Sequence, residues 1–270
     1  MQKIVLLVFA ILASASVSVA WAEEGQGDWV TLDRARLRLV DGGVEGGRRL
    51  AGVQIELSPG WKTYWRIPGE SGVPPVFDWS ASANLKEAQV LFPAPARLHD
   101  EGGEAIGYEN AVIFPIEVVA SDPARPVSLK LKLNFAVCQA ICIPAEATLS
   151  ETLPVDPAAM PDRQLLLDGL AKVPAATGGG LEVRDAALTP SREREGYELV
   201  VRLDGTVDTP VDIFVEGDPD LYFAAPKRLD AALFGLPVLG LKQPEALVGK
   251  PLTLTVVAGE RSVVRSVIVR

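Results

Sequence analysis

Apolar and polar residues alternate with a period of two along most of the chain. In residues 34–39 charged and apolar side chains alternate without a break, and residues 51–57 repeat the same spacing. A period of two places one set of side chains on a core and the other in water, as in a half-buried β-strand. Asp41-Gly42 and Gly46-Gly47 lie between the two runs and favour turns. The pattern therefore predicts a hairpin with a longer loop.

Further runs of this kind recur along the chain, separated by proline and glycine. The other candidate strands are residues 61–65, 76–79, 88–92, 112–119, 127–137, 147–153, 181–183, 197–203, 211–215, 221–223, 252–257 and 263–269. No long helical pattern lies between them. Closely spaced strands with this punctuation are typical of all-β sandwiches, so we predict an all-β fold.

The pattern changes between residues 154 and 180. Three prolines precede an apolar run over residues 164–170, which is long enough for no more than about two helical turns. Residues 178–180 are three successive glycines, whose high ordering cost is typical of a linker. We predict a β domain over residues 24–156, a linker with a short helix over 157–177, and a second, smaller β-sandwich-like domain over 178–270.

The first 22 residues have the pattern of a secretory signal peptide. Lys3 precedes an uncharged, mostly apolar run over residues 4–20, and Ala20-Trp21-Ala22 fits the small-x-small cleavage pattern. The alternative is an uncleaved anchor, but the run is at the short limit for a bilayer span. We expect residues 1–22 to be removed on export and no later segment to span a membrane. Outside the cytosol, two cysteines can hold a disulfide.

Composition and charge exclude several classes of site. The net charge of −9 argues against nucleic-acid binding, because neutralising phosphates requires clustered lysine and arginine. The chain has one histidine, so it contains no site that needs two imidazoles, such as a multi-histidine zinc or copper centre. We expect no cofactor. The two cysteines are then the candidate chemistry.

Cys138 and Cys142 follow the strand predicted for residues 127–137. The three residues between them can form a tight reversal that brings the two sulfurs within disulfide distance, and Pro144 would fix its exit. A loop of about five residues contributes roughly 2 kcal/mol as a staple, against roughly 4 kcal/mol for a bridge between distant strands. The spacing therefore favours a redox pair over a purely structural disulfide, which stays open as the alternative.

The sequence around the cysteines provides no group that would activate a thiol. Residues 135–144 carry no formal charge, and no His, Lys or Arg lies within five residues of either cysteine. Burial alone would raise the pKa of a thiol. An electron carrier whose partner supplies the attacking thiolate fits these surroundings better than a thioredoxin-like attacker.

Three segments resemble a known family. Residues 138–149 resemble the cysteine segment of the N-terminal periplasmic domain of the DsbD and ScsB membrane thiol reductases, also labelled disulfide bond corrector. Residues 59–72 resemble an aromatic early segment found especially in ScsB, and residues 107–116 resemble the part after the loop that covers the cysteines. The resemblance, over about residues 30–155, implies an immunoglobulin-like β-sandwich in the periplasm.

The resemblance also implies an activity, a protein thiol-disulfide oxidoreductase that acts as an electron relay. Cys138 and Cys142 would be the redox pair, with Cys142 the sulfur that enters mixed disulfides. The donor would be a DsbD/ScsB/CcdA-like membrane thiol reductase, and the acceptors periplasmic thioredoxin-fold proteins. A cap loop over residues 99–108 would shield the pair, with His99, Tyr108 or Tyr64 beside it.

This chain departs from DsbD in several ways. DsbD spaces its cysteines more widely and has a more aromatic cap, whereas residues 99–104 here are polar and glycine-rich. The membrane and thioredoxin-like domains of those reductases do not occur in this sequence. A lone His99 in a polar loop is more typical of a solvated side chain, and Trp61, Tyr64 and Trp65 are more typical of a core than of a binding surface.

Two other functions use the same residues. A CxxxC pair resembles that of the copper-assembly Sco proteins, and thiolates are soft ligands for Cu(I), so Cys138 and Cys142 are candidate copper ligands. Against this, Sco proteins have a thioredoxin-like fold and a later histidine, whereas His99 lies upstream. The second alternative is a binding or chaperone module with a structural disulfide.

Overall fold

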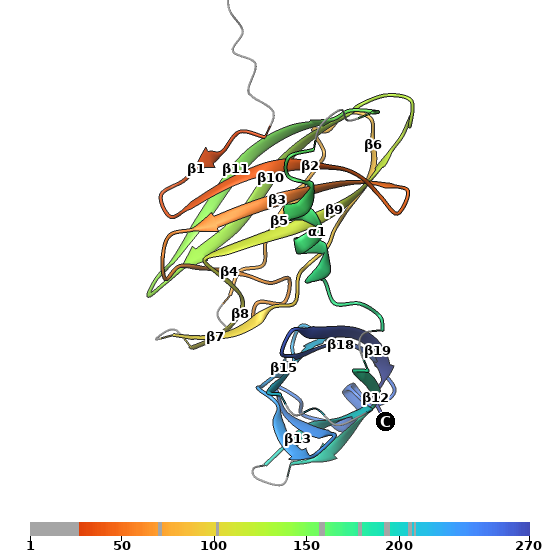
Figure 1. Cartoon of the computed structure of the whole chain (residues 1–270). Coiled ribbons are helices and arrows are strands. Elements are labelled where there is room, and N and C mark those ends of the chain that lie inside the picture. The colour runs from red at the N-terminus through yellow and green to blue at the C-terminus, as the bar shows by residue number, and fades with distance from the viewer. Residues whose placement is uncertain are drawn as a thin grey trace, which may run out of the picture.

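The computed structural model describes residues 27–69, 72–100, 103–156, 160–177, 180–191, 195–204, 207 and 209–270. Antiparallel strands dominate it, in two sandwich domains that follow one another along the chain (Figure 1). The predicted signal peptide lies outside the described residues, as do residues 101–102 of the cap loop and two linker glycines. Among the described residues, no helix has the length and apolar character needed to cross a membrane.

The first domain packs two sheets face to face. One sheet contains, in order, β1 (Val30–Thr31), β2 (Ala35–Glu45), β3 (Arg48–Leu57), β9 (Ala111–Ala120) and β6 (Leu85–Val90). The other contains β11 (Cys142–Leu153), β10 (Val127–Cys138), β4 (Lys62–Tyr64), β8 (Gly103–Glu109) and β7 (Ala96–Asp100), with β5 (Val76–Asp78) also paired to β10. The predicted all-β, immunoglobulin-like sandwich is therefore confirmed.

The alternation in β10 shows why these residues form a sandwich. Leu129, Leu131 and Leu133 are fully buried between the sheets, whereas Lys130 and Lys132 on the other face are exposed. Burying one leucine side chain stabilises the fold by about 2 kcal/mol. Trp61 and Trp65 also lie in this core, as the sequence indicated.

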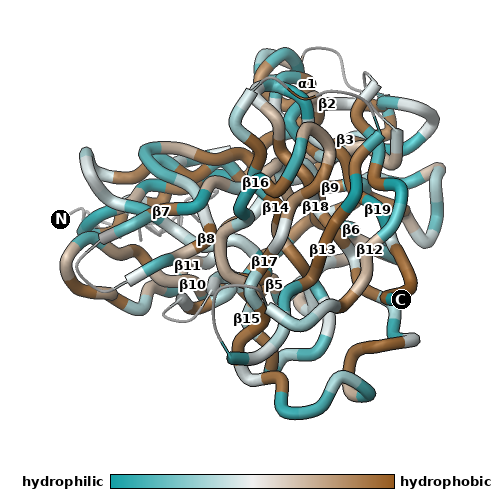
Figure 2. The backbone as a smooth tube through the Cα atoms, turned by 90° about the horizontal axis from the view of Figure 1, so that it is seen from below, coloured by the Kyte–Doolittle hydropathy of each residue, from teal (hydrophilic) through white to brown (hydrophobic). Residues whose placement is uncertain are grey.

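The second domain repeats the architecture on a smaller scale. One sheet contains β12 (Glu182–Pro190), β13 (Tyr197–Asp204), β17 (Leu233–Leu239) and β15 (Tyr222–Phe223), with β16 (Lys227–Asp230) paired to β17. The other contains β14 (Val211–Glu216), β18 (Pro251–Ala258) and β19 (Arg261–Ile268); a 3-10 turn, η1, spans Pro244–Ala246. Figure 2 shows hydrophobic stretches interspersed with hydrophilic ones along the backbone. A separate apolar core fills this domain.

The short helix of the linker belongs structurally to the first domain. Helix α1 (Arg163–Ala171) buries Leu166 against Val40 and Leu50. The carboxylate of Asp162, at its start, is 2.7 Å from the Arg38 guanidinium. After the helix, the Ala175 carbonyl accepts a hydrogen bond from the Val264 amide of the second domain. The short connection after α1 is thus attached to both domains.

Candidate functional site

Cys138 and Cys142 close the β10–β11 hairpin as a disulfide. Cys138 is the last residue of β10 and Cys142 the first of β11, and the two are directly paired across the hairpin, with a Cα–Cα distance of 4.2 Å. The pairing runs without a bulge from Val127 opposite Leu153 to this pair. The alternating core residues fix the register, since a one-residue slip would turn the whole apolar face to water. The predicted tight reversal is confirmed.

The two cysteines differ in their exposure. The Cys138 residue is 1 % exposed and packs with Tyr64, Ala105 and Ala136 in a small apolar cluster separate from the main core. Cys142 is exposed, next to Ile141, which is 68 % exposed at the hairpin tip. Cys142 is therefore the more accessible of the two cysteines.

Tyr64 is the aromatic residue that lines the disulfide. Its hydroxyl lies 2.7 Å from the Cys138 sulfur and 3.0 Å from the Cys142 sulfur. Burial raises the pKa of Tyr64, so its phenol stays protonated near neutral pH and can donate a hydrogen bond to a sulfur. The structure thus brings Tyr64 to the site, one of the two tyrosines that the resemblance indicated.

Tyr108 lies on the opposite face of the same sheet. Its ring contacts Phe114 in the main core at 5.4 Å, and its hydroxyl donates to the Pro93 carbonyl at 2.8 Å. Residue 107 of β8, not residue 108, is paired with Tyr64, and neighbouring residues of a strand point to opposite faces. Tyr108 is therefore not a wall of the disulfide, which corrects that expectation.

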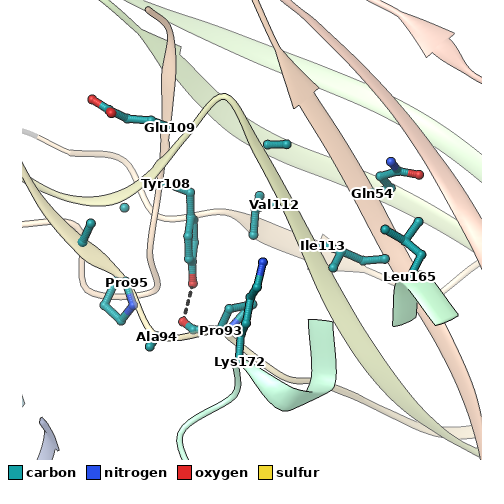
Figure 3. A pocket seen from close by; sticks show the side chains of 13 residues that line it. Gln54, Pro93, Ala94, Pro95, Tyr108, Glu109, Val112, Ile113, Leu165 and Lys172 are labelled. Atoms are coloured by element: carbon teal, nitrogen blue, oxygen red, sulfur yellow. Dashed lines mark hydrogen bonds between the residues drawn. The ribbon is translucent and has the colours of Figure 1, made fainter. Parts of the chain in front are cut away.

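A cleft of about 350 Å³ lies beside Tyr108, away from the cysteines. Figure 3 shows the Tyr108 hydroxyl bonded to Pro93, with Lys172 reaching past it and with Ile113 and Leu165 on the other side. Neither cysteine lines this cleft. The cleft is therefore not part of the disulfide site.

The predicted cap loop is mostly a hairpin. Residues 96–100 and 103–109 form β7 and β8, and Ala105 of β8 packs against Cys138. Four successive buried residues, 105–108, hide the period of two that would have predicted this strand. His99 lies on β7 with its side chain 71 % exposed, 3.2 Å from the Glu104 carboxylate. The structure thus places His99 beside the Glu104 carboxylate and, among the described residues, in contact with neither sulfur.

Lys62 is a neighbour of the disulfide that the sequence did not predict. It is directly paired with Cys138 on one side and with Glu109 on the other, and it is 5 % exposed. Directly paired residues project from the same face of a sheet, with Cβ atoms about 5 Å apart. Burial lowers the pKa of Lys62, and the Glu109 carboxylate partly restores it. Strand pairing therefore places a lysine directly opposite Cys138, although no Lys, Arg or His lies near Cys138 along the sequence.

The geometry defines a class of protein, a β-sandwich with a disulfide between one exposed and one buried cysteine. Residues 35–154 match the family model described as thiol:disulfide interchange protein DsbD, N-terminal. The matched segment contains both cysteines of the disulfide.

A solved structure shares the fold of both domains. The crystal structure of the N-terminal periplasmic domain of ScsB from Proteus mirabilis superposes with a TM-score of 0.70 and 23% identity. The match covers 90% of this chain and 98% of that chain, so it includes the second domain, which the family model does not reach. No curated protein matches the chain.

Proposed function

We propose that the protein is a periplasmic relay that transfers reducing equivalents through Cys138 and Cys142. The donor is a DsbD/ScsB/CcdA-like membrane thiol reductase, and the acceptors are thioredoxin-fold proteins of the periplasm. The observation that carries this proposal is the unequal exposure of the two cysteines of one disulfide. The family match and the likeness to a periplasmic domain of ScsB support the compartment and the type of partner.

The reduction step follows from the geometry. A donor thiolate attacks the exposed Cys142 sulfur, the S–S bond breaks, and Cys138 leaves with the electron pair as a thiolate. The Tyr64 hydroxyl, 2.7 Å from that sulfur in the disulfide form, donates a hydrogen bond to the developing negative charge. A second donor thiolate then attacks the donor sulfur of the mixed disulfide and releases Cys142. The donor becomes a disulfide, and this protein gains two electrons, with protons taken from solvent.

The oxidation step runs the same chemistry towards the acceptor. The Cys142 thiolate attacks an acceptor disulfide and forms a mixed disulfide. Cys138 then attacks the Cys142 sulfur, re-forms the internal disulfide and releases the acceptor as a dithiol. In-register pairing of β10 and β11 keeps Cys138 next to Cys142 throughout, so resolution is fast and intramolecular.

The hairpin also argues against a purely structural disulfide. Its strands are held by continuous backbone pairing and by the buried leucines of β10, none of which needs the S–S bond. A staple that closes so short a loop adds only roughly 2 kcal/mol.

Trapping tests the relay in cells that express the full chain. Cys138→Ser keeps the exposed Cys142 without its resolving partner and is expected to accumulate a mixed disulfide with a thioredoxin-fold protein. Cys142→Ser keeps only the buried thiol and is the matched control, expected to give at least about tenfold less adduct. Absence of an adduct with Cys138→Ser would overturn the proposal.

A further inference from the structure

The second domain holds the β7–β8 hairpin through a buried arginine. The Arg97 side chain, on β7, is 5 % exposed. It donates to the Asp212 carboxylate of β14 at 3.0–3.2 Å and to the Ile213 carbonyl at 3.3 Å. Its guanidinium also lies over the Phe214 ring, 5.2 Å from the centroid. A buried guanidinium is favourable only with such partners, so this contact fixes β7 against the second domain.

Glu104 extends the same contact to β8. Its carboxylate accepts hydrogen bonds from Arg97 and from the Tyr222 hydroxyl of the second domain. Burial would raise the pKa of Glu104, but the bond from Tyr222 and the charge of Arg97 lower it below its ordinary value. The next residue, Ala105, packs on Cys138. The residue that bonds to the second domain is therefore the direct neighbour, along the chain, of a residue that packs on the disulfide.

A second set of contacts between the domains involves the two residues that follow Tyr64, the other residue that packs on Cys138. Phe214 of β14 enters the core of the first domain and lies 5.8 Å from Trp65, ring to ring. Arg66 makes two hydrogen bonds to Glu216, at 2.6 and 2.8 Å. Trp65 and Arg66 directly follow Tyr64 in the chain. Figure 1 shows β4, β7 and β8 at the end of the first domain that faces the second.

We propose that the second domain positions Tyr64 and Ala105 over Cys138, through Asp212, Phe214 and Glu216, and thereby restricts attack to the Cys142 sulfur. These three are positioning residues, since none of them touches a sulfur in the described structure. The role of this selectivity in electron transfer rests on the proposed function. The difference in accessibility between the two thiols can be measured without any partner. A domain contact that served only to join the two domains would affect stability and leave the accessibility of Cys138 unchanged.

Alkylation of the reduced full-length protein tests this directly. Limiting iodoacetamide labels the two thiols, and mass spectrometry gives the ratio of Cys138 to Cys142 adducts. The wild-type protein is expected to react almost wholly at Cys142. Asp212→Asn removes one carboxylate from Arg97, and we expect it to raise the Cys138 share about tenfold, because a charge-assisted bond no longer opposes local opening.

Two further variants complete the experiment. Phe214→Ala removes the ring between Trp65 and Arg97 and is expected to raise the Cys138 share in the same direction. Asp204→Asn is the matched control, since it breaks the exposed ion pair with Arg184 in the second domain by the same chemical change. It is expected to label as the wild type does.

The outcomes separate this proposal from the relay. A Cys138 share within about twofold of wild type in Asp212→Asn, with native circular dichroism, overturns it, and so does an equal rise in Asp204→Asn. If Phe214→Ala does not fold, Asp212→Asn alone decides. The reagent is a small molecule, so the result is independent of any partner. A negative trapping experiment would overturn the relay and not the role of the second domain. A negative alkylation experiment would overturn the role of the second domain and not the relay.

Discussion

Two long hairpins, one in each domain, share a scaffold but differ in their ends. β10–β11 and β18–β19 are both paired in register along their whole length, and each contributes fully buried leucines to its core. The first closes on Cys138 opposite Cys142, whereas the second closes on Ala258 opposite Arg261 through a turn at Gly259. The second hairpin shows that such a scaffold holds its terminal pair together without a disulfide. The first hairpin therefore differs from the second in its terminal cysteine pair and in the Tyr64 and Ala105 side chains that cover Cys138.

Truncating a core leucine in either hairpin is expected to give the largest loss of stability. Leu131 and Leu254 are both fully buried, and Leu→Ala at such a site costs about 3 kcal/mol in transfer and cavity terms. All five tryptophans lie in the first 79 residues, so tryptophan fluorescence follows the first domain in denaturant, while circular dichroism follows both. A loss of stability below about 1 kcal/mol for either variant would show that the buried leucine of that hairpin contributes little to the stability of its domain.

Glu151 of β11 is expected to make the stability of the first domain depend on pH. Burial raises the pKa of Glu151 to about 7, and the charges of Asp41 and Asp162 add to this, against the Thr152 amide and Arg38. The native state then keeps a proton that the unfolded chain loses near its ordinary pKa of 4.5, so stability falls as pH rises from there to about 7.

Glu151→Gln removes this loss. At pH 8 its free energy of unfolding is expected to exceed that of the wild type by up to about 3 kcal/mol. At pH 4 this gain is expected to be absent. Urea unfolding of both proteins at the two pH values measures the difference. Glu146→Gln is the exposed control. An equal effect of Glu151→Gln at both pH values would contradict the assignment.

Removing both cysteines tests whether the first hairpin depends on its disulfide. The double variant Cys138→Ser, Cys142→Ser is expected to lose all thiol exchange but no more than roughly 2 kcal/mol of stability. The first hairpin would then behave like β18–β19, which has no such bond. A loss beyond about 4 kcal/mol, followed by tryptophan fluorescence, would instead favour the structural role.

Lys62 is expected to give the smallest effect. In the Cys142→Ser background, Lys62→Met removes the cation paired with Cys138, so the pKa of that thiol is expected to rise by about one unit or less. Thiolate absorbance against pH measures it. Lys132→Met, which removes an exposed cation from β10 with the same change of charge, is the control. An equal shift in both variants would mean that Lys62 acts only through net charge.

Local patterns in the sequence predicted the scaffold. The period of two located β10, and three residues between two cysteines at its end predicted the reversal that the structure shows. The short apolar run after residue 163 predicted α1. By contrast, β17 was missed because Gly235 and Pro237 interrupt its apolar residues, and proline within a run argues against a strand.

The surroundings of the disulfide were not predictable in this way. Lys62 lies opposite Cys138 only because β4 pairs with β10, and Arg97 meets Asp212 only because two domains pack together. Such contacts join distant parts of the chain and leave no periodic signal. The family resemblance identified Tyr64 as a candidate, but it could not choose between Tyr64 and Tyr108. Their positions on opposite faces of one sheet made that choice.

The redox state of the pair in its own cells tests the central claim most directly. Acid quenching followed by alkylation with a mass-tagged maleimide separates reduced from oxidised Cys138 and Cys142 in the exported protein. A relay supplied by a membrane donor predicts that a substantial fraction is reduced in an oxidising compartment, and that this fraction falls when the donor is removed. A pair that is fully oxidised whether or not the donor is present would contradict the account.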